Sequence, residues 1–273
     1  MELALAVSLL LSAGIGVSLG MFGGGGSILA VPMLVLVTHL APAAAVGTSL
    51  AMVGATSLVA SYAYHRQGQV APKVALSFGL SGVLTAFLGA KLTALVSGSL
   101  LLYAFALLML VVGVGMLFGR GRTAAAESRR PAVPVRPAAS VLAGAGVGFV
   151  TGFLGVGGGF LVVPALVAFA GLELRRAVGT SLLVIAINSA AGFAGHLAGG
   201  QLELGLLGLL TTAAVAGALL GERLARRVST TRLRRGFGLL VIVVGLLVTI
   251  QRALSANEVR ADAQLRSYGL TST

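Results

Sequence analysis

The stretch Gly20-Met21-Phe22-Gly23-Gly24-Gly25-Gly26-Ser27 interrupts an apolar run that extends from Leu3 to Thr38. A related stretch, Gly152-Phe153-Leu154-Gly155-Val156-Gly157-Gly158-Gly159, interrupts a second apolar run in the later half of the chain. Glycine has no side chain and costs about 1 kcal/mol relative to alanine inside a helix. Each glycine run therefore predicts a break, with one helical piece before it and another after it.

A constant offset relates the two stretches and many other positions, because adding 132 to a number in the first half gives its counterpart in the second. Val31-Pro32 matches Val163-Pro164, and Gly47-Thr48-Ser49 matches Gly179-Thr180-Ser181. This agreement without a gap indicates an internal duplication. Many membrane transporters consist of two repeats, each with a broken helix that marks the binding site. The pattern therefore predicts a transporter whose site lies at the two breaks.

Composition excludes an ordinary soluble domain. Hydrophobic residues make up 57% of the 273 residues, the mean hydropathy is +1.03, and apolar runs long enough to cross a bilayer recur along the chain. The net charge of +12 lies in short loops between these runs, so it is interpreted as a topology signal and not as a nucleic-acid surface. The absence of cysteine excludes disulfides and thiolate metal sites. The start of the chain lacks a basic segment, so we expect its first apolar run to be a retained helix.

The expected fold class is an all-α polytopic membrane protein with two inverted repeats. Each repeat is expected to hold a Gly-broken re-entrant helix pair and three transmembrane helices. The domains are expected at 1–118 (first membrane repeat), 119–139 (basic cytoplasmic linker), 140–252 (second membrane repeat) and 253–273 (C-terminal tail). The expected helices are Leu3–Leu19, Ser27–Thr38, Val46–Tyr64, Val74–Leu92, Leu100–Phe118, Ser140–Gly152, Phe160–Ala170, Val178–His196, Leu204–Gly221 and Leu233–Ile250.

Loop charges predict the orientation of the repeats. The linker holds five arginines against one glutamate, and the turn expected near Arg223 is also rich in arginine, so both are expected in the cytoplasm. The segment 39–44 carries no Lys or Arg, whereas its counterpart region has Arg175 and Arg176. Equivalent loops therefore fall on opposite sides, with both termini outside. The alternative is two parallel four-helix halves, which would place the cluster Arg223–Arg235 outside.

The helix starts after the two breaks are the candidate site. The first amides of a helix lack intrahelical partners and carry the positive end of its dipole, and glycines let a ligand approach them. If the repeats are inverted, the two starts meet near the midplane and favour an anion. The alternative is that the glycines only allow close helix packing, as Gly144, Gly148 and Gly152 are expected to do. Pro32 and Pro164 are interpreted as structural bends.

Hydroxyl and amide side chains form a second constellation. Helical spacing places Ser181, Ile185, Asn188, Gly192 and His196 on one face, and the equivalent face in the first half has Ser49, Val53, Thr56, Ala60 and Tyr64. Such a stripe could donate hydrogen bonds to an oxyanion, or its hydroxyls could bond back to their own helices. The expected substrate-binding residues are Gly23, Gly24, Gly25, Gly26, Ser27, Thr48, Ser49, Gly155, Gly157, Gly158, Gly159, Thr180, Ser181 and Asn188.

Acidic residues are expected only at termini and helix ends, which leaves no buried carboxylate for a cation or a proton relay. A cation pump is therefore not expected, nor a metal site or cofactor. His39, His65 and His196 are interpreted as interfacial. Lys91 and Arg223 occupy equivalent positions and could either attract anions or snorkel to the interface.

These motifs resemble the sulfite exporter TauE/SafE family, also called the 4-toluene sulfonate uptake permease family. The resemblance rests on Gly20–Gly26 with Val31-Pro32 and Gly47-Thr48-Ser49, and on the second copy of each motif. It extends from Leu3 to Ile250. It implies a polytopic inner-membrane transporter of sulfur-containing anions such as sulfite, thiosulfate or organosulfonates. More distant thiosulfate importers use cysteines in the path, which this chain lacks.

The sequence thus predicts a secondary transporter or facilitator of a small sulfur-containing anion, and no enzyme. The expected partners are the anionic substrate and the lipid bilayer, without nucleic acid, and a homodimer is compatible with the sequence. The alternatives are an anion channel, an intramembrane hydrolase using Ser49 or Ser181 with a histidine, and an assembly factor without a substrate.

Overall fold

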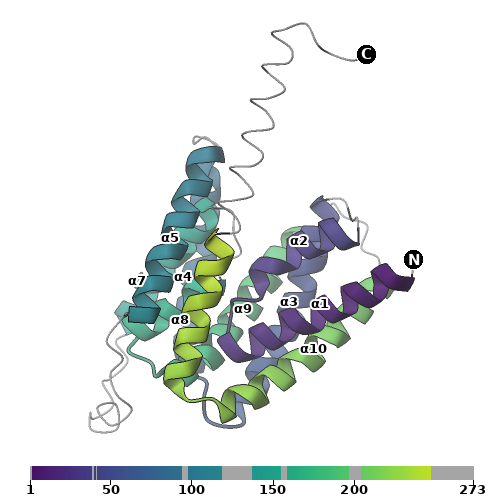
Figure 1. Ribbon diagram of the computed structural model, residues 1–273. Coiled ribbons are helices and arrows are strands. Elements are labelled where there is room, and N and C mark those ends of the chain that lie inside the picture. The colour runs from purple at the N-terminus through teal and green to yellow at the C-terminus, as the bar shows by residue number, and fades with distance from the viewer. Residues whose placement is uncertain are drawn as a thin grey trace, which may run out of the picture.

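The computed structural model describes residues 2–38, 40, 42–93, 98–118, 137–154, 159–196 and 204–246, and within these ranges the chain is helical with short turns and no strand. The helices are α1 (Glu2–Phe22), α2 (Ser27–Val37), α3 (Pro42–His65), α4 (Pro72–Thr93), α5 (Gly98–Phe118), α7 (Pro137–Leu154), α8 (Gly159–Ala168), α9 (Leu174–His196) and α10 (Leu204–Arg227). Another helix covers residues 230–246. Figure 1 shows their arrangement, with α1 beside α10 on one side and α4, α5 and α7 on the other.

Two pairs of parallel helices pack through glycine and alanine. A methyl group on Gly148 of α7 would overlap the backbone of Gly82 in α4, and one on Gly16 of α1 would overlap the backbone of Ala214 in α10. By the offset between the halves, Gly82 corresponds to Ala214 and Gly16 to Gly148, so the two contacts are equivalent. Close backbone approach of this kind is typical of membrane helices, because it increases van der Waals contact.

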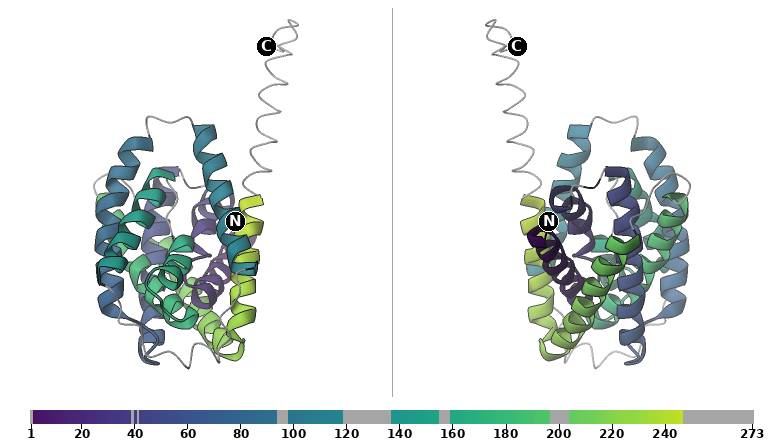
Figure 2. Two further views of the ribbon diagram at one scale, coloured as in Figure 1. Left: turned by 90° about the vertical axis from the view of Figure 1, so that its left-hand side faces the viewer. Right: turned by 90° about the vertical axis from the view of Figure 1, so that its right-hand side faces the viewer.

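Two other pairs join equivalent helices and run antiparallel. In the centre, a methyl group on Gly179 of α9 would lie 2.8 Å from Cβ of Tyr64 in α3, and one on Gly54 would lie 3.0 Å from Cβ of Ser189. Residue numbers therefore increase along α3 in the direction in which they decrease along α9, so the two helices are antiparallel. At the periphery, Gly113 of α5 faces the helix 230–246, which runs beside it (Figure 2).

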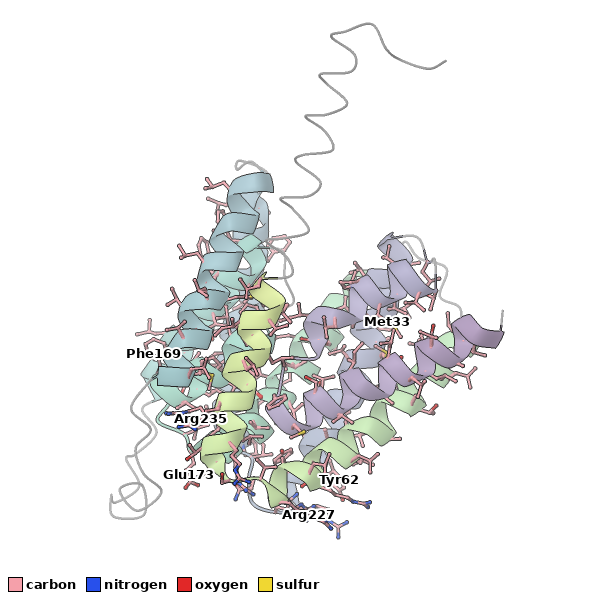
Figure 3. All side chains as sticks on the ribbon, in the orientation of Figure 1. Met33, Tyr62, Phe169, Glu173, Arg227 and Arg235 are labelled. Carbon is pink, nitrogen blue, oxygen red and sulfur yellow. The ribbon has the colours of Figure 1, made fainter. Side chains whose placement is uncertain are left out.

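Five of the described helices, namely α1, α3, α4, α9 and α10, are long and apolar enough to cross a membrane by length and composition. Large apolar side chains such as Leu84 (72% exposed) and Phe87 (65% exposed) face outward, as expected for a surface covered by lipid. Arginines gather at one end of the bundle, where Figure 3 shows Arg227 and Arg235 together with Glu173 and Tyr62. We call this the arginine-rich end.

The structure corrects one helix boundary. The sequence predicted that the helix from Leu204 would end at Gly221, with a turn near Arg223. Instead α10 continues to Arg227, and the turn lies at 228–229. The extension has strong helix formers, and the spacing of Glu222 and Arg226 gives an i,i+4 ion pair that stabilises the last turns. The predicted linker and tail lie largely outside the described residues.

Candidate functional site

The first glycine break lies between α1 and α2, and all four of its glycines are buried. Gly23 has φ of +71°, a left-handed conformation that side chains other than glycine rarely adopt. The hydroxyl of Ser27 donates to the carbonyl oxygen of Gly24 at 2.8 Å, and the Ser27 amide donates to the same oxygen at 3.3 Å. Ser27 therefore holds the break and begins α2.

The second break comes into direct contact with the first. A methyl group on Gly24 would overlap the carbonyl group of Gly159, the first residue of α8. A methyl group on Gly159 would lie 2.8 Å from the Ser27 hydroxyl oxygen. The starts of α2 and α8 therefore lie together in the interior, as the sequence predicted for two helix starts that converge.

The α9 face that the sequence singled out turns toward this contact. The single hydroxyl proton of Ser181 is shared between two carbonyl oxygens, that of Gly23 at 2.6 Å and that of Val178 at 2.7 Å. One turn further, Ile185 Cδ1 would lie 3.1 Å from a methyl group on Gly159. Side chains four residues apart share a helix face, which explains why both reach the breaks.

These hydroxyl bonds also orient the amides of the break. In a trans peptide the carbonyl and the following N–H lie in one plane and point in opposite directions. Ser181 holds the carbonyl of Gly23 and therefore directs the amide of Gly24 away from α9. Ser27 acts in the same way on the peptide between Gly24 and Gly25. Within the described part of the chain, the amides of Gly24, Gly25 and Gly26 have no hydrogen-bond acceptor.

Asn188 follows Ile185 by one turn, near Gly79 of α4. Its Oδ1 is buried and has no donor among the described residues. The hydroxyl of Thr56, at the equivalent position of α3, is also buried without a partner there. Buried polar atoms of this kind usually bind water or a ligand.

Three of the predicted hydroxyl residues lie elsewhere or bond locally. Thr180 Oγ1 accepts a hydrogen bond from the Ala71 amide at 3.0 Å, so it anchors the turn between α3 and α4. Ser49 donates to the carbonyl oxygen of Val46 at 3.0 Å within α3, and Thr48 is buried in the same turn. The described contacts do not bring these side chains to the breaks. Gly155, Gly157 and Gly158 lie outside the described residues.

One acidic residue departs from the sequence prediction. Glu222 was expected at a helix end with no buried carboxylate anywhere, but it is only 2% exposed. Its Oε1 accepts hydrogen bonds from Gln67 Nε2 at 2.8 Å and from Arg226 Nε at 2.5 Å, and its Oε2 accepts from Arg226 Nη2 at 2.9 Å. The charge of Arg226 compensates the burial of the carboxylate. The i,i+4 spacing of the two residues predicts their ion pair from the sequence, but not the burial of Glu222.

The hydrolase alternative finds no support in the described ranges. They contain no group of three or more His, Asp or Glu residues that could hold a metal ion. Ser181 and Ser49 give their hydroxyl protons to backbone carbonyls and not to a histidine, as a serine nucleophile would require.

Comparisons with known proteins agree with the membrane character of the chain. The family model described as Sulfite exporter TauE/SafE matches residues 8–248. A probable membrane transporter protein of Xylella fastidiosa (strain 9a5c) is 36% identical over 240 residues, which cover 86% of this chain and 90% of the relative. The probable membrane transporter protein YdhB of Bacillus subtilis is 28% identical over 237 residues, covering 86% and 96%. No solved structure matches the chain.

Proposed function

Because the chain belongs to the sulfite exporter TauE/SafE family and is a membrane transporter, we propose that it is a secondary transporter or facilitator of a small sulfur-containing anion. The substrate class is sulfite, an organosulfonate or a related oxyanion. The proposed binding site is the junction of the two glycine breaks, between the starts of α2 and α8.

The observation that carries the proposal is the buried contact between Gly24 and Gly159. It brings two helix starts together, and each start carries roughly half a positive charge from its dipole. In a low-dielectric interior this charge attracts an anion, and the amides of Gly24–Gly26, which have no acceptor among the described residues, can donate to its oxygens. Asn188 lies one helical turn after Ile185 in α9, and its buried Oδ1 is unpaired within the described structure. The side-chain NH2 group of Asn188 can donate hydrogen bonds as well.

We further propose that the halves are inverted repeats. A two-fold axis in the membrane plane reverses the direction of every helix, so equivalent helices that meet at the axis must cross antiparallel. The antiparallel pairing of α3 with α9 and of α5 with the helix 230–246 supports this arrangement. The parallel pairs α1–α10 and α4–α7 support it too. By the offset between the halves, α1 corresponds to α7 and α10 to α4, so the two pairs are equivalent.

The orientation follows from charge. We propose that the arginine-rich end faces the cytoplasm of a bacterial cell and that the protein lies in the inner membrane, with both termini outside. Because the chain has no cysteine, single cysteines introduced at Leu40 and Leu172 report the topology directly. Labelling from opposite sides is expected for inverted repeats, whereas labelling from one side contradicts them.

The function is tested with purified protein in liposomes. Uptake of radiolabelled sulfite, sulfate, thiosulfate, taurine and sulfoacetate is measured against empty liposomes and against liposomes with the Gly24→Ala variant. We expect saturable uptake of at least one of these anions by the unaltered protein. Absence of uptake and of binding for all of them contradicts the proposal. Large single-channel currents in planar bilayers would indicate an anion channel in place of a carrier.

A further inference from the structure

A hydrogen-bonded cluster joins the two halves at the arginine-rich end. Gln67 belongs to the turn after α3, in the first half, while Glu222 and Arg226 belong to α10, in the second half. The Gln67 side-chain amide donates to Glu222 Oε1 at 2.8 Å, and the Arg226 guanidinium donates to both carboxylate oxygens. Gln67 also donates to the Ala63 carbonyl at 2.6 Å, which ties the cluster to the end of α3. We call these three residues the Gln67–Glu222–Arg226 cluster.

Neighbouring bonds fasten the same end of α3 to other helices. The hydroxyl of Tyr64 donates to the carbonyl oxygen of Gly20 in α1 at 2.8 Å. The Ser61 hydroxyl donates to the carbonyl oxygen of Gly179 in α9 at 3.3 Å. Gly20 lies three residues before Gly23, so Tyr64 joins the end of α3 to the last turn of the helix that leads into the glycine break.

The cluster borders a cavity of about 160 Å³, lined by Tyr64, Gln67, Gln69, Arg175, Ala225 and Arg226. Its lining comes from α3 and the following turn on one side and from α9 and α10 on the other. A volume of this size holds several water molecules, each of which occupies about 30 Å³ in the liquid. The halves are therefore joined here by polar side chains beside a space for water, and not by a close-packed apolar contact.

The sequence positions that correspond to the cluster in the other half carry no polar side chain. The offset between the halves places Ala90 and Ala94 at the positions of Glu222 and Arg226, and Gly199 at that of Gln67. Methyl groups and a hydrogen atom cannot form the ion pair or the amide hydrogen bond. Corresponding positions of the two halves therefore carry polar side chains in one case and none in the other.

We propose that the Gln67–Glu222–Arg226 cluster is a gate, which closes the path between the glycine breaks and the arginine-rich end. This inference rests on the proposed transport function. Release of substrate toward that end requires Gln67 and α10 to separate, which breaks the bond between Gln67 and Glu222 and lets water reach the carboxylate. The equivalent alanines supply no such bond, so the cluster shifts the equilibrium of the free protein toward closure at the arginine-rich end.

The gate is tested by cross-linking. Gln67→Cys and Glu222→Cys are combined in the full chain, which has no other cysteine, and joined with a reducible bifunctional thiol reagent. We expect linking to reduce anion uptake by about tenfold or more, because the opening step is blocked, and a reductant to restore it. The matched control is Arg223→Cys with Arg227→Cys, two exposed positions one turn apart within α10, where linking leaves uptake unchanged. Unchanged uptake after complete linking of the first pair overturns the proposal.

A second measurement does not depend on transport. Spin labels at Arg66→Cys and Arg227→Cys, both exposed, report the distance across the gate by pulsed electron resonance. We expect Glu222→Gln to increase the population with the longer distance several-fold, and Glu173→Gln, an exposed acid at the same end, to leave it unchanged. Identical distance distributions for the unaltered protein and Glu222→Gln overturn the gate. If the unaltered protein transports none of the anions but the distances respond, the proposed substrate class fails and the gate stands.

Discussion

Replacing Gly24 by alanine adds one methyl group at the place where the two breaks meet. The new Cβ would overlap the carbonyl oxygen of Gly159 and lie 2.5 Å from its carbonyl carbon, whereas ordinary contact begins at 3.4 Å. The starts of α2 and α8 must therefore separate by about 1 Å, with a cost of about 1–3 kcal/mol in the free energy of unfolding, typical of overpacking. Misplacing positioned groups by about 1 Å costs on the order of 100-fold in enzymes, and we expect anion uptake to fall by at least about tenfold.

The assay compares initial uptake rates in liposomes at matched amounts of folded protein, with thermal unfolding in detergent measured on the same preparations. The control is Gly14→Ala, in the preceding helix, where an added methyl group meets no atom within 4 Å. Alanine is the better helix former by about 1 kcal/mol, so the control is expected to be as stable as the unaltered protein or more so. Normal uptake and normal unfolding of Gly24→Ala would refute the contact between the breaks, and normal uptake with lowered stability would refute its role in transport.

Four further substitutions have expected outcomes. Tyr64→Phe removes the hydrogen bond to the Gly20 carbonyl and is expected to lower the free energy of unfolding by about 0.5–1.5 kcal/mol, measured by thermal unfolding. Gly16→Leu and Gly148→Leu are expected to lower the unfolding temperature by similar amounts, since each added side chain meets the backbone of an equivalent helix; a marked difference would contradict the equivalence of the two pairs. Asn188→Leu is expected to leave stability unchanged or raised, because Oδ1 lacks a partner in the described structure, but to reduce uptake. Full uptake by Asn188→Leu would exclude the side chain from the site.

The position of the breaks could be predicted because the signal is local. A run of glycines weakens a helix whatever surrounds it, so α2 begins at Ser27 and α8 at Gly159, within one residue of expectation. The internal duplication strengthened this prediction. The α9 face with Ser181 and Ile185 followed from helical spacing alone, and the structure turns that face toward the breaks.

Residues whose environment depends on distant segments could not be placed in this way. Gly14 and Gly16 look alike in sequence, but a methyl group on Gly14 would meet nothing, whereas one on Gly16 would overlap Ala214. Thr180 was grouped with Ser181, yet its hydroxyl bonds the Ala71 amide, 109 residues away in the sequence. Glu222 was interpreted as exposed because charges near helix ends usually are. Its carboxylate accepts a hydrogen bond from Gln67 of the other half, a contact that sequence spacing does not reveal.

The hydrogen bonds at the breaks distinguish residues that position the break from residues that bind the substrate. The sequence did not separate these two roles. Ser27 and Ser181 were both expected among the substrate-binding residues, but the hydroxyl of each already donates to a glycine carbonyl, at 2.8 Å and 2.6 Å. A hydroxyl has one proton, so a direct bond to an anion would have to break the bond that holds the peptide. The oxygens of the anion are therefore better matched by the amides of the peptides that these serines orient. On this basis the serines position the break, and the glycine amides bind.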